Sequence, residues 1–185
     1  MEAFLTSTVI VAVAEMGDKT QLLSFLLAAR FRKPWPILAG ILLATLANHF
    51  LAGAVGAWIA TWIPGEILKW IVAVAFFAFG LWALKPDELG EDPAMPAAGV
   101  FLATLVAFFL VEMGDKTQLA TIALAARYDS LVAVVLGTTF GMMLANAPAV
   151  WIGEKLAHRV NMKLMRWTAA ALFWVLGVLA LLAWD

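Results

Sequence analysis

The fold of this chain is decided by a stretch that occurs twice, first as Glu15-Met16-Gly17-Asp18-Lys19-Thr20-Gln21-Leu22 and again as Glu112-Met113-Gly114-Asp115-Lys116-Thr117-Gln118-Leu119. When the comparison is extended to Arg30 and Arg127, 12 of 16 positions are identical. A second match, Leu46-Ala47-Asn48, recurs as Leu144-Ala145-Asn146. Chance similarity between apolar segments does not produce an eight-residue identity rich in charged and amide side chains, so the sequence indicates an internal duplication.

The composition is that of a protein embedded in a membrane. Of the 185 residues, 64% are hydrophobic and 14% are charged, whereas an average soluble domain is about 45–50% apolar and about 25% charged. A helix needs roughly 20 apolar residues to cross the hydrocarbon core of a bilayer. Six stretches meet this requirement: 3–29, 36–62, 66–84, 97–126, 131–153 and 165–184. We therefore predict an all-α polytopic membrane protein with six transmembrane helices that contact the lipid bilayer.

The duplication and the number of spans together predict the topology. Repeat 1 covers residues 1–85, an acidic linker covers 86–96, and repeat 2 covers 97–185, with three spans in each repeat. Because three is an odd number, the second repeat must enter the membrane upside down relative to the first, an arrangement typical of secondary transporters. Lys and Arg concentrate in the loops on one side, which predicts that this side is cytoplasmic and that both termini are non-cytoplasmic. The expected location is the bacterial inner membrane.

The net charge and the cysteine count exclude several classes of protein. A formal net charge of −1 gives no basis for a nucleic-acid partner. The absence of cysteine excludes a disulfide scaffold, a thiolate metal site and a cysteine nucleophile. No cofactor is expected, and the sequence leaves open whether the chain is a monomer or a homodimer.

Six ionisable residues fall near the middle of the first and fourth predicted spans: Glu15, Asp18, Lys19, Glu112, Asp115 and Lys116. Each costs at least roughly 2.5–3.5 kcal/mol at the centre of a bilayer, so they must face the interior of the bundle. On a continuous helix, residues three and four apart share a face. We therefore expect the charged faces of these two spans to meet and to form one pocket of oxygen ligands between the repeats.

Neutral polar residues extend this predicted pocket. Gln21, Gln118, Asn48 and Asn146 could add carbonyl oxygens as metal ligands. For Thr20 and Thr117 two interpretations stay open, ligation through the hydroxyl or a hydrogen bond to the backbone of their own helix. Gly17 and Gly114 lie inside each cluster, where glycine permits either close approach of another backbone or a local break.

The charge of the pocket indicates which ion it holds. Four carboxylates and two lysines leave −2, which a divalent cation neutralises, with Lys19 and Lys116 balancing charge and coupling protons. In an empty, poorly hydrated pocket, desolvation and like-charge repulsion favour protonated carboxylates, so protons replace the metal. All-oxygen sites favour Mg²⁺, Ca²⁺ and Mn²⁺. His49, beside Asn48, is either an ordinary buried histidine or a proton or ligand group.

Other interpretations of the same residues remain at this point. Glu15–Lys19 and Glu112–Lys116 could be intrahelical salt bridges that only stabilise the bundle, which would leave Asp18 and Asp115 without partners. The two Gly-Asp pairs could form the dyad of an intramembrane aspartyl protease. The pocket could also carry an organic cation or an amino acid, or the chain could be a structural membrane subunit.

The duplicated Glu-x-Gly-Asp-Lys-Thr resembles the signature of a cation/proton exchanger family that includes the Golgi manganese and calcium transporters of eukaryotes and short bacterial manganese exporters. This family was long labelled "uncharacterised protein family sixteen". The resemblance covers the whole chain. It implies a secondary transporter, not an enzyme, that exports Mn²⁺, with Ca²⁺ as a second candidate, in exchange for protons. It also implies that Glu15, Asp18, Glu112 and Asp115 are the metal ligands.

Overall fold

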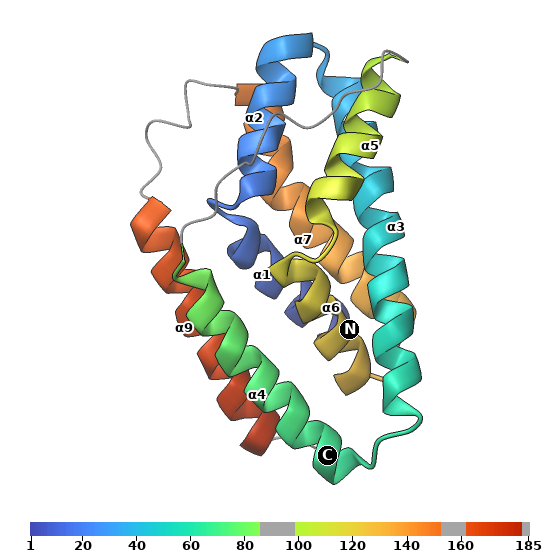
Figure 1. Cartoon of the computed structure of the whole chain (residues 1–185), viewed down its shortest axis with the longest axis vertical. Coiled ribbons are helices and arrows are strands. Elements are labelled where there is room, and N and C mark those ends of the chain that lie inside the picture. The colour runs from blue at the N-terminus through green and yellow to red at the C-terminus, as the bar shows by residue number, and fades with distance from the viewer. Residues whose placement is uncertain (86–98, 153–161, 183–185) are drawn as a thin grey trace.

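The computed structural model describes residues 1–85, 99–152 and 162–182, and every regular element within them is an α-helix (Figure 1). The helices are α1 (Glu2–Glu15), α2 (Lys19–Phe31), α3 (Pro34–Ala60), α4 (Gly65–Ala83), α5 (Val100–Glu112), α6 (Lys116–Arg127), α7 (Leu131–Ile152) and α9 (Met162–Leu182). The predicted all-α class is confirmed. The predicted linker, 86–96, lies outside the described residues.

Among the described residues, three helices are long and apolar enough to cross a bilayer: Pro34–Ala60, Gly65–Ala83 and Leu131–Trp151. Two shorter apolar stretches are α5 (Val100–Glu112) and the part of α9 from Arg166 to Leu182. Large apolar side chains such as Leu51, Val74 and Val132 are exposed on the outer surface of the bundle. A surface of this kind suits acyl chains rather than water.

The prediction of one continuous helix over 3–29 and another over 97–126 is wrong, because each is broken at the duplicated motif (Figure 1). Gly17 and Gly114 adopt φ angles of 85° and 79°, which residues with a side chain rarely adopt. Asp18 and Asp115 are then the extended N-cap residues of α2 and α6. The expectation that Glu15, Asp18 and Lys19 share one helical face is therefore wrong as well.

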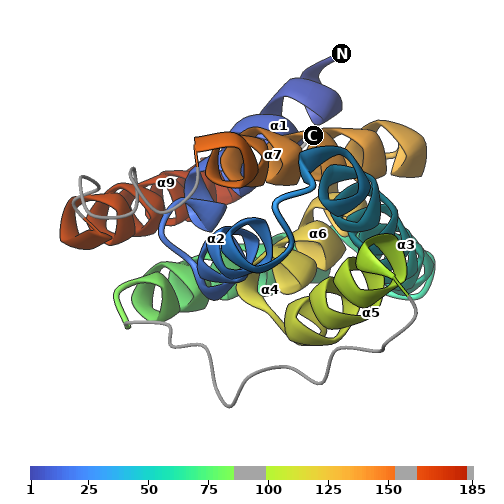
Figure 2. The same cartoon turned by 90° about the horizontal axis from the view of Figure 1, so that it is seen from above.

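The two halves of the chain pack mainly on each other. α1 lies against α7 and α5 lies against α3, and Figure 2 shows α2 and α6 in the middle of the bundle. The close approaches are reciprocal. A Cβ added to Gly137 would meet Phe4 O at 2.5 Å, and one added to Gly40 would meet Phe101 O at 2.9 Å. The same contact therefore occurs twice, with the halves exchanged.

Helices α4 and α9 form a pair of their own beside the other six (Figure 1). The indole of Trp174 covers Gly80, and the ring of Phe77 covers Gly177, again a reciprocal contact. Trp174 Nε1 also donates a hydrogen bond to Phe77 O at 3.3 Å. The pair rests on α6 through α4 and on α1 through α9, so it contacts two of the four helices that flank the motif breaks.

Candidate metal site at the two helix breaks

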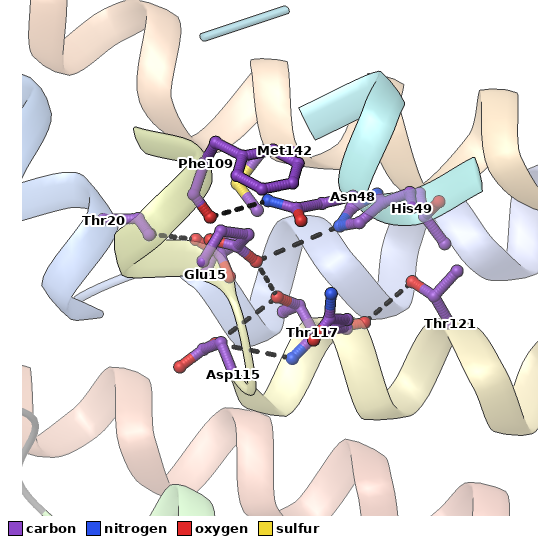
Figure 3. Close-up of polar contacts among 12 residues, drawn as sticks. Glu15, Thr20, Asn48, His49, Phe109, Asp115, Thr117, Thr121 and Met142 are labelled. Atoms are coloured by element: carbon purple, nitrogen blue, oxygen red, sulfur yellow. Dashed lines mark hydrogen bonds and ion pairs between the residues drawn. The ribbon is translucent and has the colours of Figure 1, made fainter. Parts of the chain in front are cut away.

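The two helix breaks bring acidic side chains from both halves together inside the bundle. Glu15 is the last residue of α1 and Glu112 the last of α5, and both are fully buried. Carboxylate oxygens of Glu15, Glu112 and Asp115 all lie within 4.8 Å of one another. Figure 3 shows Glu15, Asn48, His49 and Thr117 around a common centre. The predicted convergence of the two motifs is thus present, although it is built on helix ends and not on helical stripes.

Each lysine of the motif pairs with the aspartate of the other half. Lys19 Nζ lies 2.8 Å from Asp115 Oδ1, and Lys116 Nζ lies 2.8 Å from Asp18 Oδ1. The alternative of salt bridges within one helix is wrong, because the helix breaks between the two partners of each supposed pair. The ion pairs instead join the halves at the breaks, and they leave the two glutamates to other partners.

The glutamates are held by threonine hydroxyls. Thr20 donates to Glu15 Oε2, and Thr117 donates to Glu112 Oε1 at 2.6 Å. The alternative that these hydroxyls bond to their own helix backbone is therefore wrong. The second oxygens, Glu15 Oε1 and Glu112 Oε2, are buried and accept no hydrogen bond from any described residue. Each glutamate thus keeps one oxygen fixed and the other available.

The glutamine side chains stabilise the two helix breaks through hydrogen bonds to the backbone. Gln21 Oε1 accepts a hydrogen bond from Gly17 N at 3.0 Å, and Gln118 Oε1 accepts one from Gly114 N at 2.7 Å. Gln21 Nε2 also donates to Ala145 O at 3.0 Å, across the two halves. These side-chain oxygens therefore satisfy backbone amides that the break exposes, a role that the sequence analysis did not anticipate.

The two asparagines differ in what they leave available. Asn146 Oδ1 accepts a hydrogen bond from Ser24 Oγ at 2.8 Å. Asn48 donates through Nδ2 to Phe109 O at 3.0 Å, and its buried Oδ1 has no partner among the described residues. Ser24 was not among the predicted site residues, although it lies three residues after Gln21, on the same face of α2.

The buried charges define what the site can do. Asp18 and Asp115 cap helix N-termini, where the helix dipole favours a negative charge, and each also has a lysine. Glu15 and Glu112 accept hydrogen bonds from threonine hydroxyls, and their carboxylates lie close to each other and to Asp115. Two buried carboxylates in a medium of low dielectric need a cation or protons to compensate them. The arrangement can therefore hold a cation and release it when protons replace it.

Membrane helices that are broken at buried charged residues are typical of secondary transporters. The comparison with known families identifies the class: the family model of the divalent cation/proton antiporter GDT1 matches residues 3–91 and 100–184. The chain belongs to this family, as the duplicated motif indicated, and it is an integral membrane transporter and not an enzyme. An aspartyl protease is excluded, since both aspartates are also paired with lysines.

Curated relatives match over nearly the whole chain. A Vibrio cholerae protein named "Putative manganese exporter" is 48% identical over 96% of this chain and 90% of its own length. A GDT1-like protein of Synechocystis is 28% identical over 97% of both chains. GDT1-like protein 5 of Arabidopsis thaliana is 29% identical over 98% of this chain and 96% of its own. No solved structure matches the chain.

Proposed function

We propose that this chain exports Mn²⁺, with Ca²⁺ as a second candidate, in exchange for protons. The observation that carries the proposal is the cluster of Glu15, Glu112 and Asp115, whose carboxylate oxygens lie within 4.8 Å of one another and are buried. Oxygen ligands of this kind suit Mn²⁺, Ca²⁺ and Mg²⁺. The Vibrio relative named as a manganese exporter supports the choice of Mn²⁺.

In the proposed cycle, the ion binds the carboxylates of the two glutamates, each of which has one oxygen without a hydrogen-bond partner among the described residues. Asp115 and Asp18 complete the acidic ligand set, with Asn48 as an amide ligand. Lys19 and Lys116 stay close to the aspartates as built-in counter-charges. When the ion leaves, protons bind the glutamates, because two bare carboxylates at this separation repel each other strongly. The exchange of a divalent cation for protons follows from this competition.

Access from the two sides is proposed to alternate through two inverted three-helix repeats, residues 1–85 and 97–185. The reciprocal contacts of Gly40 and Gly137, and of Gly80 and Gly177, support a relation in which the halves exchange roles. Rocking of one repeat against the other would open the site to each side in turn. The distribution of Lys and Arg supports non-cytoplasmic termini, and the Vibrio relative supports the bacterial inner membrane as the location.

The test is transport by the purified protein in liposomes, with Mn²⁺ and Ca²⁺ followed by a metal dye and protons by an internal pH dye. We expect metal movement to drive proton movement in the opposite direction. Glu15→Gln and Glu112→Gln should each reduce Mn²⁺ transport at least tenfold, since even outer partners of a metal contribute about 10–100-fold. Glu66→Gln, on an exposed carboxylate of α4, is the matched control.

Two results would overturn the proposal. Metal flux without proton movement would mean a channel or uniporter. Full transport by both glutamine variants would mean that the metal binds elsewhere in the protein. Binding is checked separately by thermal stabilisation, because a ligand that binds only the folded state raises the melting temperature. A variant that folds normally but is no longer stabilised by Mn²⁺ has lost the site and not the fold.

A further inference from the structure

Among the described residues of the site, His49 is the polar residue whose counterpart in the other half is apolar. The segment Leu46-Ala47-Asn48-His49 aligns with Leu144-Ala145-Asn146-Ala147, so an alanine stands where the second half would have its histidine. The glutamates, aspartates, lysines, threonines, glutamines and asparagines of the site all occur in both halves. The oxygen-bearing side chains of the site are therefore two-fold, whereas an imidazole comes from one half only.

The imidazole of His49 is buried without a hydrogen-bond partner. Its side chain has no exposed surface, and neither Nδ1 nor Nε2 makes a hydrogen bond with any described residue. Leaving a buried polar group unpaired costs about 1–3 kcal/mol. An orphaned group in a native structure calls for a reason, and an ion that it binds is one such reason.

The imidazole also faces the acidic cluster at a distance that suits an intervening ion. His49 Nε2 lies 4.0 Å from Glu112 Oε1, which is too far for a hydrogen bond. Figure 3 shows the ring directed at the carboxylates, with Asn48 beside it. Two ligand atoms that each lie about 2.0–2.2 Å from one ion are at most roughly 4.4 Å apart. An ion between His49 Nε2 and the Glu112 carboxylate therefore fits the observed separation, and Oε1 can bind it while still accepting the hydrogen bond from the Thr117 hydroxyl.

We propose that His49 Nε2 ligates the transported ion and makes the site select Mn²⁺ over Ca²⁺ and Mg²⁺. Carboxylates alone do not separate these three ions by ligand type, whereas imidazole binds transition metals and is a poor ligand for Ca²⁺ and Mg²⁺. A single nitrogen in an oxygen site thus adds affinity for Mn²⁺ and adds little for the harder ions. This inference rests on the proposed function, and it names the residue that sets ion preference.

The test is pulsed electron paramagnetic resonance of Mn²⁺ bound to the purified protein, together with Mn²⁺ and Ca²⁺ binding curves. We expect ¹⁴N modulation from a directly bound nitrogen, and we expect His49→Ala to remove it. In that variant the Kd for Mn²⁺ should rise about tenfold while the Kd for Ca²⁺ changes less than about threefold. Alanine is what the second half carries at this position, so the fold already accommodates it.

Ser7→Ala is the matched control, because Ser7 is also buried without a partner but lies two helical turns before Glu15 on α1. It should leave the nitrogen signal and both Kd values unchanged. Mn²⁺ bound by the wild-type protein without nitrogen modulation overturns the assignment of His49 and leaves the proposed function standing. Equal losses of Mn²⁺ and Ca²⁺ affinity in His49→Ala overturn the proposal that His49 sets the preference for Mn²⁺. Absence of Mn²⁺ binding overturns both proposals.

Discussion

The two helix breaks have the same local structure and different surroundings. Both have a glutamate at the end of one helix, a glycine with positive φ, and an aspartate at the N-cap position of the next helix. Yet the side chain of Lys19 is 23% exposed and that of Lys116 only 4%. Local geometry follows from the repeated residues, because backbone preferences are local. The environment does not repeat, because each break meets different neighbours.

The difference between the breaks traces to the pair α4 and α9. Within the described helices, this pair packs on α1 and α6 and makes no comparable contact with α2 and α5. A transporter built from two related halves must be asymmetric in any one state, since a symmetric site would open to both sides or to neither. In the opposite state of the proposed cycle, we expect α4 and α9 to pack on α2 and α5 instead.

The largest expected contrast lies between the two ion pairs. Lys116→Met leaves the carboxylate of Asp18 buried without its lysine, a change that costs about 3–5 kcal/mol in a buried pair. Lys19→Met should cost clearly less, because water reaches that lysine. Apparent melting temperatures in detergent measure both, and Lys69→Met, in an exposed pair, is the control. Equal losses would mean that the exposure of Lys19 has no energetic consequence.

A second contrast concerns ligation by the two asparagines. Asn48→Leu should raise the Kd for Mn²⁺ about tenfold, or about 1.4 kcal/mol, since its free oxygen is available to the ion. Asn146→Leu should change the Kd less and lower the melting temperature more, because its oxygen already accepts a bond from Ser24. Mn²⁺ titrations and thermal melts of both variants decide this. The reverse pattern would place the amide ligand in the second half.

A third and smaller contrast compares the two glycines. Gly114→Ala should cost about 1–2 kcal/mol from the positive φ alone, because an added Cβ meets nothing within 4 Å. Gly17 is buried, so Gly17→Ala should cost more by adding crowding to the same strain. Gly114→Asn should recover part of the loss, since asparagine tolerates this conformation. If Gly114→Ala were as stable as the wild-type protein, this would contradict the positive φ angle of Gly114. Thermal melts provide the measurement.

The smallest contrast is between the glutamines. Gln21 makes two hydrogen bonds, to Gly17 N and Ala145 O, whereas Gln118 makes one with the described residues, to Gly114 N. At about 0.5–1.5 kcal/mol for each bond, Gln21→Ala should destabilise the protein more than Gln118→Ala. The difference should appear in the melting temperature and not in the Kd for Mn²⁺. A selective loss of Mn²⁺ binding would instead make these glutamines ligands.

The sequence by itself determined the duplication, the membrane helices and the set of charged residues that must converge. Each of these follows from a local cost: apolar stretches need lipid, and mid-span charges such as Glu15 and Glu112 need a polar interior. The prediction of a continuous helix through the motif gave the wrong arrangement of the site residues, however. Met16 and Asp18 are compatible with a helix, so they gave no sign of a break. The presence of Gly17 allowed a break without requiring one.

Only the tertiary structure decided which side chains meet. Lys116 pairs with Asp18 although 98 residues separate them, and no local spacing specifies such a partner. The same holds for His49, which is brought to Glu112 by the packing of α3 against α5. Local sequence fixes backbone conformation and hydropathy, whereas the pairing of charges depends on how distant helices pack. For that reason the kinds of ligand were predictable, and their arrangement was not.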